Sequence, residues 1–414
     1  MAKPCEEQSM TVVTNPAQKK ASPAEQLDQL NTETAKLNAW IRTQANSPAQ
    51  RPWFVDMGGE SGAGELAKGR VAANQMKMLA HRWRWSEIYP YLQKISEIAG
   101  EAKGELLERT DRQGILLTNP GLGGRLQITN TIRCAIAIYN HGDVAPAHVH
   151  SPNASRTILS DRGGYTNVEG ERCECRRGDI VFTPNGTWHD HGNDDPDPMI
   201  WIDMLDWPLM EYLDAVWVDQ GYIAAQDAAK SNAKSQPAVH SDGHSTRMYG
   251  HGGLKPVFAP NQRGWGQNTS PMFHYKGVDV MDTLRALRGE KGDPFEGIKM
   301  QFVNPVTGGP VFASLDYCAQ SLRPGEETGF KRETCSTFIV VLEGEGFSEI
   351  GGQRFDWVKN DIMAVPNFLW RRHVNTGKND AVLYTVSDKA LLTALGQYRS
   401  QGKNADGSIT QIVQ

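Results

Sequence analysis

Apolar residues recur at helical spacing in two stretches near the N-terminus. The first stretch covers residues 23–47 and the second covers about 68–99, and each places its apolar side chains on one face of an α-helix. Pro90 should interrupt the second helix, because proline has no amide hydrogen to donate to the preceding turn. We therefore expect a disordered tail over residues 1–24 and a helical N-terminal arm over residues 25–105.

From Gly114 the pattern changes to short apolar segments separated by Gly, Pro, Asn and Asp. Short strands at this spacing are typical of a β-sandwich or barrel. A second block of the same texture runs over about 300–386, and a helical pattern follows near Lys389–Tyr398. Between the blocks, residues 220–275 are rich in Ala, Ser, Asn, Gly and Gln, which favours a connecting arm. The predicted strands of the first block are Ile115–Leu117, Ile132–Tyr139, Arg156–Leu159, Ile180–Thr183 and Met199–Leu205.

The two strand-rich blocks repeat one another. The string GDIVFTPNGTWHDHGN, from Gly178, aligns with NDIMAVPNFLWRRHVN, from Asn360. Similarly, HGDVAPAHVHSPNASRTILSDRGGY aligns with PGEETGFKRETCSTFIVVLEGEGF once one gap is allowed. Such repetition indicates a mainly β protein made by tandem duplication of one module. The expected divisions are a first module over 106–215, a connecting arm over 216–295, a second module over 296–400 and a tail over 401–414.

The composition narrows the classes of function. The 414 residues carry a formal net charge of −5, with Lys and Arg scattered along the chain. This gives no basic patch for a nucleic acid or an anionic membrane. No apolar run is long enough to span a bilayer, and the polar N-terminus is unlike a secretory signal. The six cysteines are few for this length, and we expect them to be reduced thiols of a cytoplasmic protein.

Two His-x-His pairs in the first module predict a metal site. His148 and His150 form the first pair, and His189 and His191 form the second. On a strand, residues two apart point to the same face, so both imidazoles of a pair can reach one ion. Three neutral imidazoles suit Fe(II), Mn(II), Cu(II) or Zn(II), and the ligand type alone does not choose among these metals.

The residues around these histidines match two known motifs. Gly142 lies five residues before His148-x-His150, and the second string reads Gly178-x5-Pro184-x-Gly186-x2-His189-x3-Asn193. These spacings resemble the two motifs of the cupin superfamily, which implies jelly-roll barrels, here two in tandem with an N-terminal helical extension. The glutamate ligand usual in the first motif is missing, and SPNASR stands in its place.

Three-histidine cupins without that glutamate resemble the gentisate, salicylate and 1-hydroxy-2-naphthoate 1,2-dioxygenase family. Further strings similar to that family are LLTNPGL, APAHVH, TWHDHGN, WIDMLDWPL, FDW and LLTALGQYR, and the resemblance covers roughly residues 75–400. It implies one Fe(II) per chain, held by His148, His150 and His189, with O2 as co-substrate and a homotetrameric assembly. The implied partner is a small aromatic hydroxy acid.

The resemblance also implies roles for residues beside the metal. His191 is suited to take the phenolic proton of the substrate. Arg156 matches a substrate-binding arginine, whose guanidinium could fork onto a carboxylate or the oxygen species, and Arg112 matches a second such arginine. Asp203 could orient His191 or an incoming ring substituent. Each residue also has a purely structural alternative. His191 could be a core histidine, the two arginines could form surface ion pairs, and Asp203 could have a structural role.

Arg133 and Ala135 share a strand face that, by the resemblance, lines the ring pocket. An aromatic residue is often found at the first of these positions in the family, so Arg133 is a departure. We hypothesise that it accommodates a polar or anionic substituent of the ring.

The second module lacks the histidine set. His148 aligns with Lys331, His150 with Glu333 and His189 with Arg371, while His373 remains opposite His191. Two cations and a carboxylate cannot replace three imidazoles, so we predict a metal-free C-terminal module in which these residues form an internal ion-pair cluster. The remaining histidines of the connecting arm, His240, His244 and His251, are predicted to be loop residues without a metal.

The expected reaction inserts both oxygen atoms between the carboxyl-bearing and hydroxyl-bearing carbons. Its substrate would be gentisate, a substituted salicylate (5-amino-, 5-nitro- or halo-) or a hydroxynaphthoate. Two alternatives are a non-oxygenase metal cupin such as a sugar isomerase, and a ligand-binding or storage bicupin. The missing glutamate argues against the isomerase, and the intact histidine set argues against the storage protein.

Overall fold

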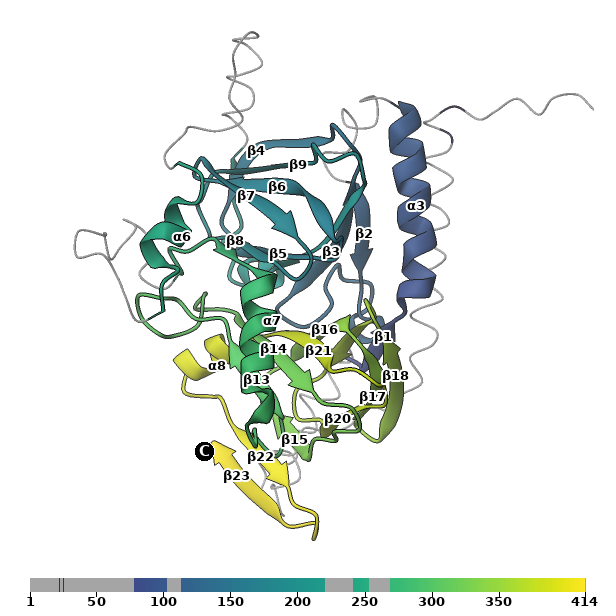
Figure 1. Ribbon diagram of the computed structural model, residues 1–414, viewed down its shortest axis with the longest axis vertical. Coiled ribbons are helices and arrows are strands. Elements are labelled where there is room, and N and C mark those ends of the chain that lie inside the picture. Colours follow the sequence, from purple (N-terminus) through teal and green to yellow (C-terminus); the bar gives the residue numbers. More distant parts are fainter. Residues whose placement is uncertain are drawn as a thin grey trace, which may run out of the picture.

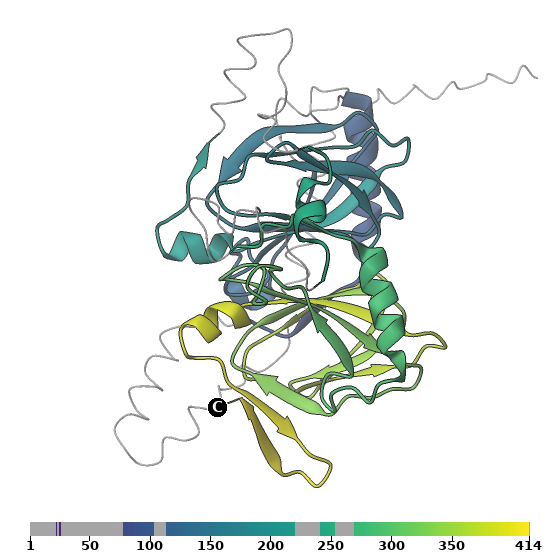
Figure 2. The ribbon, with the colours of Figure 1, turned by 60° about the vertical axis from the view of Figure 1, so that its left-hand side comes forward.

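The computed structural model describes two β-barrels in tandem, stacked on one another (Figure 1, Figure 2). The described residues are 22, 25, 78–102, 113–219, 241–252 and 269–413. Apart from residues 22 and 25, the predicted tail and the predicted helix over 23–47 lie outside them. So does the start of the predicted second helix. No helix in the described ranges is long and apolar enough to cross a membrane.

The N-terminal barrel consists of two facing sheets. One has the strand order β12-β8-β5-β10-β3-β2, and the other has the order β11-β4-β9-β6-β7. Non-consecutive neighbours in both sheets give the crossovers expected of a jelly roll. The strands are β2 (Gly114–Leu117), β3 (Arg133–Tyr139), β4 (Val144–His150), β5 (Ala154–Ile158), β6 (Arg162–Val168), β7 (Glu171–Arg176), β8 (Ile180–Thr183), β9 (His189–Gly192), β10 (Met199–Leu205), β11 (Val218–Asp219) and β12 (His274–Tyr275).

The C-terminal barrel repeats this arrangement. Its sheets have the orders β1-β19-β16-β21-β14-β13 and β18-β17-β20-β15-β22-β23. The strands are β13 (Ile298–Gln301), β14 (Asp316–Leu322), β15 (Phe330–Glu333), β16 (Thr337–Glu343), β17 (Glu345–Ile350), β18 (Gln353–Val358), β19 (Ile362–Val365), β20 (Arg371–Asn375), β21 (Ala381–Ser387), β22 (Ser400–Lys403) and β23 (Ile409–Val413). The repeat extends to backbone conformation, because Gly178 (φ 82°) and its counterpart Asn360 (φ 69°) both take the left-handed form, which Asn tolerates better than most residues.

The N-terminal arm connects the two barrels. β1 (His81–Trp83) pairs antiparallel with β19 of the C-terminal barrel, whereas α3 (Trp85–Ala102) packs its apolar face on the N-terminal barrel. The expectation that Pro90 interrupts the helix is wrong, since α3 runs through it. The carbonyl that loses its donor belongs to exposed Ser86, where water can replace the missing hydrogen bond.

Two segments that were expected to be a connecting arm and a tail contain helices and strands. Within residues 216–295, β12 adds an edge strand to the N-terminal barrel. The segment also contains α6 (His244–Tyr249), α7 (Gly277–Ala286) and the 3-10 helix η2 (Leu287–Gly289), so His244 begins a helix and is not a loop residue. The expected tail over 401–414 is a β-hairpin instead, since β22 pairs with both β15 and β23. The remaining helices are η1 (Pro120–Leu122), α4 (Trp207–Tyr212) and α8 (Lys389–Ala394).

The largest hydrophobic core lies between the barrels. It joins the outward side chains of β3, such as Ile136, to those of β16, such as Val340 and Leu342. Each barrel also has a smaller interior core. Across the junction the Tyr384 hydroxyl donates to the Gly178 carbonyl (2.9 Å), and Arg177 pairs with Glu343 (2.8 Å). The alternation along β3 therefore separates a junction face (Cys134, Ile136, Ile138) from an interior face on which the site is built.

Candidate metal centre and active site

The fold brings all four predicted histidines together inside the N-terminal barrel. β4 and β9 are paired so that His148 lies opposite His189, and all four side chains are buried. The ring centroids of His148 and His189 are 4.3 Å apart, and those of His150 and His189 are 4.8 Å apart. Buried imidazoles this close require a shared partner or neutral rings.

Three of the imidazoles have one nitrogen fixed by the backbone. Nδ1 of His148 lies 2.8 Å from the Pro146 carbonyl oxygen, and His150 and His189 make equivalent 2.8 Å contacts with the carbonyls of Pro152 and Thr187. A carbonyl only accepts, so each Nδ1 carries the proton and each Nε2 keeps a lone pair. This second interaction is typical of metal-ligating histidines.

His189 has the donor atom that best fits a metal ligand. Its Nε2 is buried and has no hydrogen-bond partner within the described ranges. Burial, and then the nearby His148 and His150, hold the pKa of His189 well below its usual range, so the ring is neutral. A buried lone pair without a donor is costly unless a cation accepts it. The residues therefore fit a divalent metal.

His191 is held differently. Its Nδ1 lies 3.0 Å from the Thr166 hydroxyl of the adjacent strand β6. Its ligand atom nevertheless lies within 4.8 Å of those of His148 and His189. By distance, His191 belongs with His148 and His189. By the contact of Nδ1 with a backbone carbonyl, His150 belongs with them instead. The site offers four imidazoles in two hydrogen-bonding classes.

Arg156 and Asp203 form a buried ion pair on the opposite sheet. They face each other across β5 and β10, and Nε of Arg156 lies 3.1 Å from Oδ1 of Asp203. Arg156 also donates to the Thr183 hydroxyl (3.0 Å), and Asp203 accepts from the Trp201 indole (2.9 Å). Asp203 therefore orients Arg156, and the hydrogen bond at His191 comes from Thr166 instead.

The remaining predicted residues lie toward one end of the barrel or outside the described chain. Ala135 lies opposite Asp203 and is only partly buried. Arg133 pairs with Glu211 (3.0 Å) and stacks over Trp207 at 4.5 Å from its ring centroid. Arg112 and His240 lie outside the described residues.

Sequence reasoning missed Thr166, although the repeat contained a signal for it. The aligned strings end at Tyr165 and Phe347, and the next residues are Thr166 and Ser348. In the C-terminal barrel Oγ of Ser348 lies 2.7 Å from Nδ1 of His373, so the hydroxyl–imidazole contact is duplicated.

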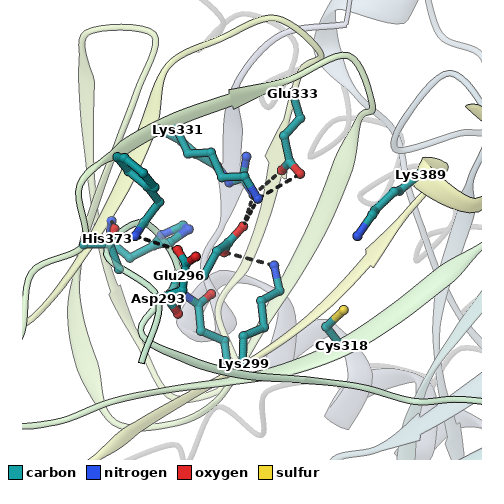
Figure 3. Close-up of polar contacts among 12 residues, drawn as sticks. Asp293, Glu296, Lys299, Cys318, Lys331, Glu333, His373 and Lys389 are labelled. Atoms are coloured by element: carbon teal, nitrogen blue, oxygen red, sulfur yellow. Dashed lines mark hydrogen bonds and ion pairs between the residues drawn. The ribbon is translucent and has the colours of Figure 1, made fainter. Parts of the chain in front are cut away.

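The counterpart of the metal centre in the C-terminal barrel is an ion-pair cluster, as predicted (Figure 3). Lys331 lies opposite Arg371 in the β15–β20 pair, the register that His148 and His189 have. Glu333 pairs with Arg371 (2.5 Å) and Lys331 (3.1 Å). Burial alone would raise the pKa of Glu333, but the charges of Arg371 and Lys331 outweigh it and hold that pKa well below its usual range.

Glu296 and Lys299 complete this cluster, and the sequence alignment did not include them. Glu296 pairs with Lys331 (2.6 Å), Lys299 (3.0 Å) and Arg371 (3.3 Å). Burial opposes ionisation of Glu296, yet the three cations hold its pKa below the usual range. The space that holds imidazoles in one barrel is filled by buried, mutually paired charges in the other.

Comparison with known proteins identifies close relatives. A family model described as "Cupin domain" matches residues 135–205 and 319–387. A 5-aminosalicylate 1,2-dioxygenase from Comamonas sp. is 32% identical over 78% of this chain and 82% of its own. A gentisate 1,2-dioxygenase from Aquipseudomonas alcaligenes is 32% identical over 77% of this chain and 86% of its own. Among solved structures, salicylate 1,2-dioxygenase from Pseudoaminobacter salicylatoxidans with gentisate is 25% identical, with a TM-score of 0.68 over 87% of this chain and 98% of its own.

Proposed function

The chain belongs to the gentisate, salicylate and 1-hydroxy-2-naphthoate 1,2-dioxygenase family of bicupins, and on this premise we propose which acid it cleaves and how. It is a ring-cleaving dioxygenase. The proposed substrate is gentisate or a ring-substituted salicylate, opened between the carboxyl-bearing and hydroxyl-bearing carbons. The two relatives that are 32% identical to this chain act on 5-aminosalicylate and gentisate, which supports a single-ring acid over the hydroxynaphthoate of a relative at 26% identity.

The observation that carries this proposal is the set of three imidazoles fixed at Nδ1 by backbone carbonyls. We assign His148, His150 and His189 as the ligands of one Fe(II), because this contact leaves each Nε2 as the donor atom. When bound, Fe(II) supplies the coordination and redox chemistry that lets dioxygen react with an aromatic ring. Histidine ligation leaves positions open for small ligands, as this reaction requires.

The protein side chains orient the substrate and move its proton. Arg156, fixed by Asp203 at 3.1 Å, supplies a buried cation for the substrate carboxylate, and its orientation is set before binding. Thr166 holds Nδ1 of His191 and so directs Nε2 of His191 toward the other imidazoles. In that position Nε2 can take the phenolic proton.

We also propose a cytoplasmic homotetramer. The five described cysteines are free thiols, in keeping with a reducing compartment. The terminal strand β23 exposes Ile409, Ile412 and Val413, and an apolar edge strand is suited to subunit contact.

Oxygen uptake by anaerobically Fe(II)-loaded protein tests the proposal. The panel is gentisate, salicylate, 5-amino- and 5-nitrosalicylate, and 1-hydroxy-2-naphthoate. We expect uptake together with a ring-opened product for at least one single-ring acid, and loss of both in His148→Ala. His373→Gln, the matched change in the other barrel, should retain activity. Stoichiometric bound iron without uptake on any acid would contradict the proposal.

A further inference from the structure

Three side chains form a charged cluster at one end of the N-terminal barrel. Arg133 donates to Oε1 of Glu211 at 3.0 Å and to the Leu126 carbonyl at 3.2 Å. The Trp207 indole donates to the same Oε1 at 2.6 Å, and its ring lies 4.5 Å from the Arg133 guanidinium carbon. The guanidinium is therefore held by a carboxylate, a carbonyl and an aromatic face.

Arg133 lies on the interior face of β3, at the end of the barrel where that strand begins. Arg133 is two residues from Ala135 on β3 and so shares its face. Farther along that face Ala137 is only 5% exposed, whereas Ala135 is partly exposed and lies opposite Asp203, the partner of Arg156. Solvent therefore reaches the interior from the Arg133 end, beyond the layer that holds Arg156.

The duplicated barrel supports this placement. The counterparts of Arg133 and Trp207 are Asp316 and Lys389, which follow the same strand and helix positions and lie 3.9 Å apart. They line a cavity of about 430 Å³ at that end of the C-terminal barrel. In both barrels a charged strand residue thus contacts the first residue of the following helix: Arg133 stacks over Trp207 in one, and Asp316 pairs with Lys389 in the other.

The orientation of Glu211 leaves one hydrogen-bond acceptor available. Both donors contact Oε1, and Oε2 makes no hydrogen bond with the described residues. Glu211 and Trp207 are four residues apart on α4, so they lie on one face of the helix. That helix is fixed at its start by Asp206, which accepts from the Asn153 amide at 2.8 Å.

We propose that Glu211 is a specificity residue that selects ring substituents able to donate a hydrogen bond. The inference rests on the proposed function: with carboxylate and hydroxyl at the imidazoles and Arg156, the far end of the ring points to the Arg133 end of the barrel. Oε2 accepts from a hydroxyl or amino group there, and it repels acceptor-only groups such as nitro or carboxylate. The substrate class is thus a salicylate with a hydroxyl or amino group opposite its ring hydroxyl.

This inference revises the hypothesis for Arg133. Its charge is already neutralised by Glu211, so an anionic substituent would have to displace a carboxylate. Arg133 acts instead by holding Glu211 in place.

The test compares kcat/KM for gentisate and 5-aminosalicylate with that for 5-nitrosalicylate in the Fe(II)-loaded full chain. In Glu211→Gln, which keeps the size but removes the charge, the donor-over-nitro ratio should fall roughly three- to tenfold, the worth of one hydrogen bond. Trp207→Phe keeps an aromatic ring but removes one of the two donors that hold Oε1, and should shift the ratio in the same direction by less. Glu349→Gln is the control, because Glu349 pairs with Arg372 (2.7 Å) beside Phe330 in the C-terminal barrel, and its ratio should equal that of the wild type.

The outcomes separate the two proposals. Turnover retained with a ratio unchanged in both Glu211→Gln and Trp207→Phe would overturn this inference alone. A wild type that prefers 5-nitrosalicylate to both donor-bearing acids would do the same. A wild type that binds iron but cleaves none of the acids would overturn the proposed function and this inference with it.

Discussion

The two barrels share one hydrogen-bonded framework and differ in what fills it. Asn193 and Asn375 each donate to two backbone carbonyls at equivalent places. Asp206 and Asp388 each accept from a backbone amide at 2.8 Å. Yet one barrel encloses imidazoles and the other encloses salt bridges. The framework therefore does not depend on the metal site.

The retained histidine of the C-terminal barrel shows which contact belongs to the framework. His373 keeps its hydroxyl contact, from Ser348 at 2.7 Å, as His191 keeps that of Thr166 at 3.0 Å. The hydroxyl–imidazole bond therefore persists where the other three histidines are gone. In our proposal His191 takes its catalytic role from its neighbours, and the bond supplies only its orientation.

The largest expected effect comes from removing one imidazole of the carbonyl-fixed set. His189→Ala should bind no stoichiometric iron and show no ring cleavage, because two fixed imidazoles are too few to retain the ion. Iron analysis together with oxygen uptake measures this change. A variant that keeps both iron and activity would show that His189 is not a ligand.

The next effect concerns the salt bridges of the C-terminal barrel. Glu333→Ala leaves Arg371 and Lys331 short of a partner, so the free energy of unfolding should fall by about 3–5 kcal/mol. The more exposed pair Glu349–Arg372 is the control, and Glu349→Ala should cost about 0–1 kcal/mol. Urea denaturation gives both values, and equal losses would contradict the assignment of the buried cluster as structural.

A third effect depends on pH. Burial, and then the Arg371 charge, lower the pKa of His373 to about 3, so below pH 6.5 the unfolded chain takes up a proton that the folded chain does not. Stability should therefore decline as pH falls from about 6.5 toward 3, by up to roughly 1.4 kcal/mol per pH unit from this group. His373→Gln should make the decline shallower.

Glu296 and Glu333 add to this loss at lower pH. Their folded pKa values lie below the ordinary 4.5, so their contribution is present above that pH and is lost as the pH falls further. Unfolding curves at a series of pH values distinguish the two windows. An identical slope in wild type and His373→Gln above pH 4.5 would rule out the contribution of His373.

The smallest expected effect compares the two hydroxyls. Thr166→Val should lower kcat roughly tenfold by loosening His191, and Thr166→Ser should restore it. Ser348→Ala should leave kcat unchanged and reduce stability by about 1 kcal/mol. Steady-state kinetics with urea unfolding separates these results, and equal kcat values for Thr166→Val and wild type would remove the orienting role.

The sequence predicted those features that depend on local pattern or on the repeat. The period-two histidine pairs predicted that each pair shares one strand face, and the two strands prove to be paired neighbours. The alignment placed Lys331, Glu333 and Arg371 together. Glu296 was missed because the aligned strings begin at His141 and Pro324, and Glu296 lies before them in the chain. The Arg133–Glu211 pair was missed because it joins residues 78 positions apart, and no strand or helix periodicity reports such a contact.

The pairing of β1 with β19 constrains the order in which the molecule can be completed. His81 pairs with Ala364, so β1 can form its hydrogen bonds only after β19 has been synthesised. α3 can pack on the N-terminal barrel before that. A fragment containing only the second half of the chain would expose the β19 edge, which is a template for aggregation. Separately expressed halves should therefore behave worse than the intact chain, unless the β1 segment is supplied with the second half.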